Sequence, residues 1–177
     1  MTFSHVHGHK HQRRPLTARP PRLSIRAAIE QAHRSMCHNQ QGAALWHYTR
    51  DTSVVIAGHN HRPRGSDRDC KIKSTCESTC LIASIHAMQD ALFHAGTNAR
   101  GADMLHVRVR DGLLEPVAPP SCLPCGKMIL DSGIVHVWLY HRHGWRRYTA
   151  HEFHARSLDV SGLVTKPHAH PIGSCCM

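Results

Sequence analysis

The sequence contains no run of eighteen apolar residues, and its N-terminal residues lack the apolar stretch of a secretory signal peptide. The first absence excludes a transmembrane helix, and the second argues against export. The eight cysteines are therefore expected to be reduced thiols and metal ligands, because disulfides persist mainly in oxidising compartments. We expect a cytoplasmic or nuclear protein with no membrane partner.

Acidic residues are scarce as well. The 177 residues include 12 Asp and Glu against 22 Lys and Arg, which gives a formal charge of +10. This balance favours a phosphate-bearing partner, either a nucleoside or nucleotide or a single-stranded nucleic acid, although a solvated basic surface would give the same charge. Residues 1–21 contain no acid and are rich in His, Arg and Pro, so we predict a disordered tail there. One domain is expected at residues 22–160, followed by a second tail at residues 161–177.

Hydrophobic periodicity predicts helices and strands in alternation. An apolar repeat near 3.6 residues indicates a helix from Leu23 to His38, and β-branched or alternating segments indicate strands. The remaining elements are expected as strands 44–50 and 53–58, helix 81–95, strand 104–110, helix 123–132, strand 134–140, and a last helix that begins at the capping box of Thr149 and Glu152. This order favours an α/β fold with helices on both faces of the sheet.

The sharpest local motif is Cys122-Leu123-Pro124-Cys125 at the start of a predicted helix. Two thiolates at this spacing can bind one tetrahedral zinc ion, and the helix N-terminus stabilises their negative charge. The same motif also fits a redox pair or half of a structural zinc site. His86, within the helix predicted for residues 81–95, could join the two cysteines. One His and two Cys would leave a fourth position open, as at a catalytic zinc.

These segments resemble the cytidine/deoxycytidylate deaminase superfamily. His86-Ala87-Met88 is similar to the first half of the family's H-x-E … P-C-x-x-C signature, and Ser121-Cys122-Leu123-Pro124-Cys125 is similar to the second. The stretch GHNHRPRG from Gly58 resembles the family's G-x-N-x-x-P-x-G loop. The resemblance implies a three-layer α-β-α fold with a mixed central sheet, Zn²⁺ bound by the His and two Cys, and a sugar-binding role for Asn60.

The resemblance fails at the residue that carries the chemistry. Met88 stands where the family has the glutamate that moves protons between water, the ring nitrogen and the leaving amine. A thioether cannot act as a general acid or base, and a methionine here would pack apolar surface. Glu77, on the loop before the helix, or Asp90, four residues after His86 on the same helix face, could replace it. Both acids are equally explained as solvated charges.

Two further groups are candidates for binding. Arg64, with neighbouring Arg residues in RPRGSDR, could contact a phosphate or remain a solvated loop charge. Cys70, Cys76 and Cys80 could form a second, structural zinc site with a nearby histidine, or be three free thiols.

Three functions are consistent with these patterns. The resemblance implies a zinc-dependent hydrolytic deaminase acting on a cytosine or adenine-type base in a nucleoside, nucleotide or nucleic acid. Met88 favours a catalytically inactive zinc-binding protein of the same fold, serving as a structural or nucleic-acid-binding subunit of a homo- or hetero-oligomer. The third is an unrelated zinc module, in which the loop cysteines rather than His86 would complete the Cys122 and Cys125 site.

Overall fold

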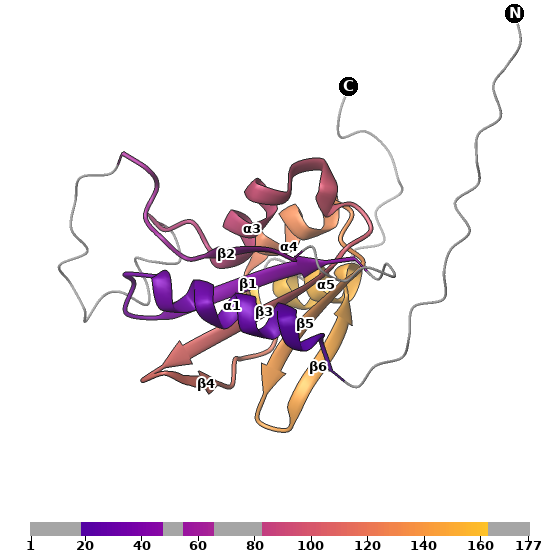
Figure 1. The fold of residues 1–177 in the computed structure, drawn as a ribbon. Coiled ribbons are helices and arrows are strands. Elements are labelled where there is room, and N and C mark those ends of the chain that lie inside the picture. The colour runs from indigo at the N-terminus through magenta and orange to yellow at the C-terminus, as the bar shows by residue number, and fades with distance from the viewer. Residues whose placement is uncertain (1–18, 48–54, 66–82, 163–177) are drawn as a thin grey trace, which may run out of the picture.

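A mixed β-sheet runs through the molecule with helices on both of its faces (Figure 1). The computed structural model describes residues 19–47, 55–65 and 83–162, so the predictions for Glu77, Cys70, Cys76 and Cys80 lie outside the described residues. The sheet order is β2-β1-β3-β5-β6, and β4 pairs with β3 at one end. Strands β3 and β5 are parallel and the other pairs are antiparallel. The strands are β1 (Gln40–Trp46), β2 (Val55–His59), β3 (Asp103–Arg110), β4 (Leu113–Glu115), β5 (His136–His141) and β6 (Gly144–Thr149).

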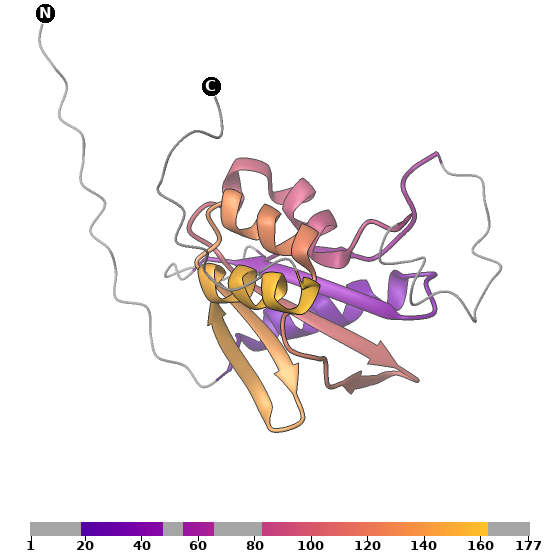
Figure 2. The same ribbon diagram turned by 180° about the vertical axis from the view of Figure 1, so that it is seen from behind.

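Helix α1 (Arg22–Arg34) covers one face of the sheet. The opposite face carries α3 (Ala87–Ala95), α4 (Leu123–Asp131) and α5 (Ala150–Ser161), which lie in front of the sheet in Figure 2. The alternating side chains of β1 divide between two cores: Ala44 and Trp46 pack toward α1, and Ala43 and Leu45 pack toward the other three helices. The predicted three-layer α-β-α arrangement with a mixed sheet is confirmed.

Element boundaries differ from the sequence-based expectation where tertiary pairing decides. Helix α1 ends at Arg34 rather than His38, and Met36, predicted on its apolar face, is 97% exposed. Strand β1 begins at Gln40 rather than Ala44, because its polar first residues pair with β3. The helix expected from residue 81 begins at Ala87, since Ile85 forms a β-bridge with His61. The capping box is confirmed: Glu152 N–H donates to Thr149 Oγ1 (3.1 Å), and Thr149 N–H donates to Glu152 Oε2 (2.7 Å).

Two glycines allow helices to approach the sheet closely. A Cβ added to Gly42 in β1 would lie 1.8 Å from the carbonyl oxygen of Ala28 in α1. A Cβ on Gly58 in β2 would lie 2.4 Å from the backbone nitrogen of Ala91 in α3. Both contacts are with backbone atoms, so the helices could dock at this depth only against residues without a side chain.

Among the described residues, no helix has the length and apolar character needed to cross a lipid bilayer.

Candidate metal centre and pocket

The starts of helices α3 and α4 converge on one point of the structure. His86 is the N-cap residue of α3, and Cys122 is the N-cap residue of α4. The expectation that His86 lies within a helix is therefore wrong, because the bridge at Ile85 holds the preceding residues extended. This position places two helix N-termini, each with a positive dipole end, beside the same pair of thiols.

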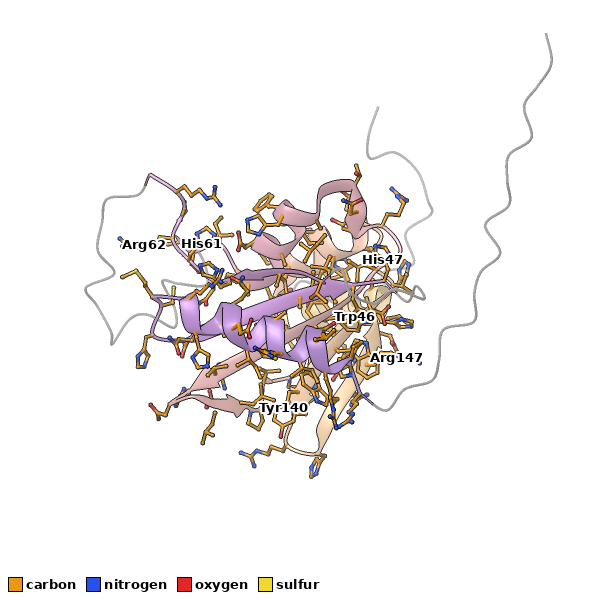
Figure 3. The ribbon with its side chains drawn as sticks, viewed as in Figure 1. Trp46, His47, His61, Arg62, Tyr140 and Arg147 are labelled. Atoms are coloured by element: carbon orange, nitrogen blue, oxygen red, sulfur yellow. The ribbon has the colours of Figure 1, made fainter. Side chains whose placement is uncertain are left out.

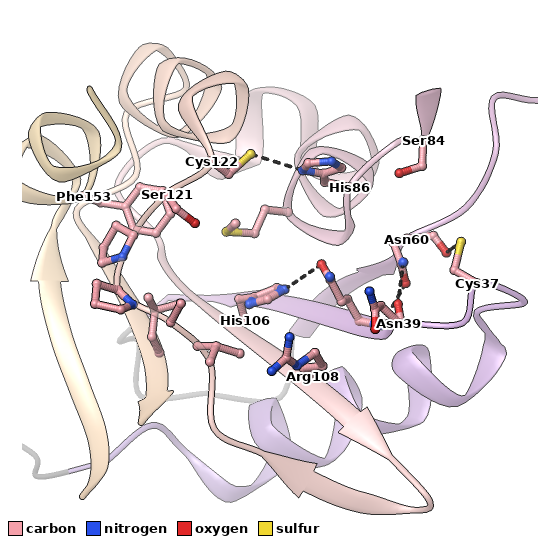
Figure 4. A pocket seen from close by; sticks show the side chains of 17 residues that line it. Cys37, Asn39, Asn60, Ser84, His86, His106, Arg108, Ser121, Cys122 and Phe153 are labelled. Carbon is pink, nitrogen blue, oxygen red and sulfur yellow. Dashed lines mark hydrogen bonds between the residues drawn. The ribbon is translucent and has the colours of Figure 1, made fainter. Parts of the chain in front are cut away.

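His86, Cys122 and Cys125 are brought together as the sequence predicted. Nδ1 of His86 lies 3.1 Å from Sγ of Cys122 and 3.2 Å from Sγ of Cys125, and the first of these contacts is drawn in Figure 4. All three ligand atoms lie within 4.8 Å of one another. Nitrogen and sulfur ligands of one tetrahedral zinc ion are about 3.5 Å apart, given Zn–N and Zn–S bonds of about 2.0 and 2.3 Å. The group could therefore hold a metal ion after a small outward adjustment.

The two thiols differ in the direction of their pKa shifts. A hydrogen bond from the Cys125 side chain, assisted by His86, lowers the pKa of Cys122 to about 5. The same hydrogen bond, together with complete burial, raises the pKa of Cys125. The backbone N–H of Cys125 also donates to Cys122 Sγ at 3.3 Å. The lowered pKa of Cys122 favours its thiolate, the form in which cysteine binds metals.

A cavity of about 360 Å³ opens beside this group, and His86 and Cys122 form part of its wall. Its volume falls within the range of about 300–1,000 Å³ typical of small-molecule sites. Polar side chains of Asn39, Asn60, His106 and Arg108 line the side away from the thiols, as Figure 4 shows. Apolar side chains, including those of Leu139 and Phe153, line much of the rest. The cavity can thus offer apolar contact and directional hydrogen bonds to a small ligand.

The described wall of this cavity contains no carboxylate. Met88 lines it and is 5% exposed, packed in the core between the sheet and the three helices. Asp90 is buried but lies elsewhere: its carboxylate accepts from the backbone N–H of His59 and lies near the His61 ring. The suggestion that Asp90 is a solvated charge is therefore wrong, and it does not line the pocket. Glu77 lies outside the described residues and remains a sequence candidate.

His106 is a pocket residue that the sequence analysis did not identify. Burial, assisted by the charges of His86 and Arg108, lowers its pKa to about 4, so the imidazole is neutral at pH 7. Nε2 lies 3.1 Å from Oε1 of Gln41 and donates to it, because an amide oxygen only accepts. One available clue was the two-residue period of a strand, which places His106 and Arg108 on one face of β3.

Asn60 lies at the edge of the pocket, and both the oxygen and the nitrogen of its side-chain amide form a hydrogen bond. Oδ1 accepts from the backbone N–H of Gln41 (2.8 Å), and Nδ2 donates to the carbonyl oxygen of Asn39 (2.7 Å). These bonds join the residue after β2 to the start of β1. The sugar-binding role of Asn60 stays a prediction. Arg64 is exposed and is not part of the pocket wall, and its phosphate role also stays a prediction.

We expect Asn60→Ala to reduce the free energy of unfolding by about 2 kcal/mol, because it removes the hydrogen-bond partners of a half-buried N–H and a half-buried carbonyl oxygen. Chemical denaturation would measure the loss. Asn98→Ala, at an exposed position, is the matched control and should change stability by less than about 0.5 kcal/mol. Equal effects of the two variants would contradict a structural role for the Asn60 amide.

No protein-family model and no curated protein matches the sequence. Among solved structures, the cytidine deaminase from Burkholderia pseudomallei is similar over 74% of this chain and 93% of its own chain, with a TM-score of 0.50 and 20% sequence identity. The chain has a cytidine deaminase-like fold. A mutant cytidine deaminase from Mycobacterium tuberculosis is also found, with a TM-score of 0.41 and 12% identity over 71% of this chain and 88% of its own. Within the cytidine deaminase-like fold described here, the His and two Cys lie together at the starts of α3 and α4.

Proposed function

We propose that the chain binds Zn²⁺ through His86, Cys122 and Cys125 and catalyses the hydrolytic deamination of a cytosine or adenine-type base in a nucleoside, nucleotide or nucleic acid. One observation carries the proposal: His86 and Cys122 belong both to the metal-binding group and to the wall of a cavity of about 360 Å³. A metal ion bound there would therefore face a ligand in the cavity. The cytidine deaminase-like fold supports the same chemistry.

The donor set fits zinc. Two cysteines and one histidine are ligands that Zn²⁺ takes in proteins, and three protein ligands leave a fourth position for water or substrate. When bound, zinc would supply a Lewis acid that lowers the pKa of water toward 7. The thiolate form of Cys122 prepares the site for the ion, and the complete burial of Cys125 excludes solvent from its inner side.

The polar wall suits the recognition of a base. A neutral His106 and the side chains of Asn39 and Arg108 offer hydrogen-bonding groups toward the cavity. Phe153 and Leu139 offer apolar surface for the faces of a ring. The net charge of +10 supports a substrate that carries phosphate, which the exposed Arg64 is available to contact. We propose no single base, and we leave both a homo- and a hetero-oligomer as expected assemblies.

Deamination consumes one water and releases ammonia, so protons must pass from the water to the leaving amino group. A positioned acid or base contributes about 10²–10⁴ to the rate of such a step. Glu77 is our candidate for this role, since the described pocket wall offers no carboxylate.

Met88 supports a second candidate function, a zinc-binding partner protein without turnover. The methionine is buried, and it packs against the core at the position where the resembling enzymes keep their glutamate. Such a protein would hold zinc and bind a nucleotide or nucleic acid without changing it.

Met88→Glu should raise ammonia release by about 10²–10⁴ over the unaltered chain, because it adds a proton carrier to the pocket wall. The assay would use cytidine, deoxycytidylate, adenosine and single-stranded DNA, with the zinc content of each sample measured in parallel. Met88→Gln is the matched control, since it adds a polar side chain of the same length that cannot exchange a proton at neutral pH.

The outcomes separate the two candidates. Turnover of the unaltered chain that is lost in Glu77→Ala would establish an enzyme with a relocated acid. Zinc without turnover in the unaltered chain, and activity gained only in Met88→Glu, would favour the partner protein. A chain that binds no zinc at His86, Cys122 and Cys125 would contradict both.

A further inference from the structure

Strands β5 and β6 present a largely uncovered face on the side of the sheet that carries α1. Among the described residues, α1 packs mainly on β1, β2 and β3, and α5 contacts β5 and β6 from the opposite side. Trp138 of β5 belongs to the core on the α1 side, and Trp145 of β6 packs against that core. The two-residue period of a strand places Tyr140 and Arg147 on the same face, and Figure 3 labels both.

This face carries an aromatic pair with an arginine next to it. Tyr140 and Trp145 are partners across the two strands, and their ring centroids lie 5.3 Å apart. Both side chains are only partly buried, so each ring keeps some contact with solvent. Two residues along the strands, the Arg147 guanidinium lies 5.6 Å from the centroid of the buried Trp138 ring. The completely buried Asp103 accepts a hydrogen bond from Trp138 Nε1 (3.2 Å) and fixes that ring.

The charge around these rings has one sign. Residues 132–151 contain no Asp or Glu and include three arginines and four histidines. Arg142 and His143 are exposed in the turn between β5 and β6. On α1 the one acid, Glu30, is paired with Arg26 at 2.7 Å. The face therefore favours an anionic partner.

Exposed aromatic rings among cationic side chains are the features by which proteins bind single-stranded nucleic acid. Unpaired bases stack on the rings, and the phosphates contact arginines and release their counterions. A duplex keeps its bases stacked on one another, so the rings would add nothing to its affinity. We propose that the α1-side face of β5 and β6 binds single-stranded nucleic acid, with bases stacked on Tyr140 and Trp145 and a phosphate held by Arg147. Every base has a stacking face, so this surface does not select a sequence.

The proposed surface is separate from the metal-binding group and its cavity. Leu139 of the cavity wall belongs to the core on the opposite side of the sheet. The two sites are joined through the backbone, because the N–H of Val117, another wall residue, donates to the carbonyl oxygen of Tyr140 (2.8 Å). A strand bound by the hairpin would lie across the sheet from the cavity without occupying it. The inference goes beyond the proposed function and does not rest on deamination.

The test measures binding of the full chain to fluorescent oligo(dT) of about 12 nucleotides, within the range of about 4–16 that comparable surfaces cover. Tyr140→Leu and Trp145→Leu keep apolar volume and remove the planar ring, so each should weaken binding about fivefold or more. Arg147→Ala should lower the slope of log affinity against log salt by about 0.7, the contribution of one phosphate contact. A DNA duplex of the same length should bind more weakly and respond to neither leucine variant.

The chain offers a matched control for each kind of substitution. Arg156→Ala removes an arginine that also lies 5.6 Å from the centroid of a buried ring, that of Tyr148, but on α5 at the other side of the sheet. Phe93→Leu removes an exposed ring on α3. Both should leave the affinity for oligo(dT) unchanged. The N-terminal residues are basic as well, so the difference between matched variants decides rather than the total affinity.

Four results would overturn the proposal. They are equal binding of duplex and oligo(dT), unchanged affinity in both leucine variants, equal losses in Arg147→Ala and Arg156→Ala, and a preference for phosphatidylserine vesicles that the same variants abolish. The last result would assign the face to a lipid surface.

Tryptophan fluorescence of the unaltered chain provides a measurement that needs no substitution. Of the three tryptophans, Trp46 and Trp138 are 1% and 2% exposed, so the emission accessible to acrylamide comes from the partly buried Trp145. Saturating oligo(dT) should shield this emission from acrylamide, and unchanged quenching would reject the surface. A chain that releases no ammonia should show the same shielding, so the two proposals can fail separately.

Discussion

Cys125→Ser should abolish tight metal binding by the group of His86, Cys122 and Cys125, and it should remove the stabilisation that the metal gives to the fold. A ligand present at a thousand times its Kd stabilises the folded state by about 4 kcal/mol, and the variant should lose a contribution of this size. The Sγ of Cys125 is completely buried and lies 3.2 Å from His86 Nδ1. An exposed side chain cannot reach this position to replace the missing thiolate ligand. Thermal unfolding with and without added zinc measures the effect.

The matched control is Cys37→Ser. Cys37 also lines the pocket, but its Sγ lies 3.8 Å from the carbonyl oxygen of Asn60 and it is not part of the metal-binding group. It should keep the full response to zinc. An unchanged zinc response of Cys125→Ser, or equal losses in both variants, would contradict the assignment of Cys125 as a metal ligand.

Gly42→Ala should destabilise the fold by about 3 kcal/mol or more, because overpacking of this severity forces backbone shifts. The added Cβ would lie 1.8 Å from the Ala28 carbonyl oxygen and 2.9 Å from the Ala32 nitrogen, so α1 would have to move away from β1. Denaturant titration measures the loss. Displacement of α1 would also uncover the buried face of Trp46, and Trp fluorescence would report it.

Gly126→Ala is the control for this substitution. In α4 an added Cβ would lie 3.2 Å from Nδ1 and 3.3 Å from the backbone Cα of His154, so α5 would have to move by only a few tenths of an ångström. Removing a glycine from a helix interior favours folding by about 0.5–1 kcal/mol, so this variant should be close to neutral. A mild effect at Gly42 comparable to that at Gly126 would show that α1 is not docked as described.

The sequence predicted the layers of the fold and the convergence of His86 with Cys122 and Cys125, in large part from local patterns. The 3.6-residue and two-residue periods place the helices and strands, and C-x-x-C at a helix start is a local motif. The extent of β1 could not be predicted in the same way. Its polar start is extended because Gln41 hydrogen-bonds to Asn60, the residue after β2, and pairs with Arg108 of β3. This is a property of tertiary pairing rather than of local propensity.

The residues of the pocket wall were harder to predict from the sequence than the group of His86, Cys122 and Cys125. His106 lies twenty residues after His86 in sequence, and only the tertiary fold brings both to one cavity. Asp90 was considered as a replacement for the catalytic acid or as a solvated charge. Helical spacing does not show which neighbouring strand a side chain contacts. The end of β2 supplies His59 and His61 to it, and that contact arises from a strand about thirty residues earlier.

Different parts of the fold position the candidate metal ligands and Met88. His86 and Cys122 are helix caps, held by turns and bridges at the ends of elements. Met88 lies two residues after His86, in the first turn of α3, where it packs in the hydrophobic core. A substitution at residue 88 can therefore leave the arrangement of His86, Cys122 and Cys125 unchanged. An enzyme with this arrangement could lose its chemistry by one substitution while keeping its ion, its pocket and its binding surface, and it would remain available for recruitment as a partner protein.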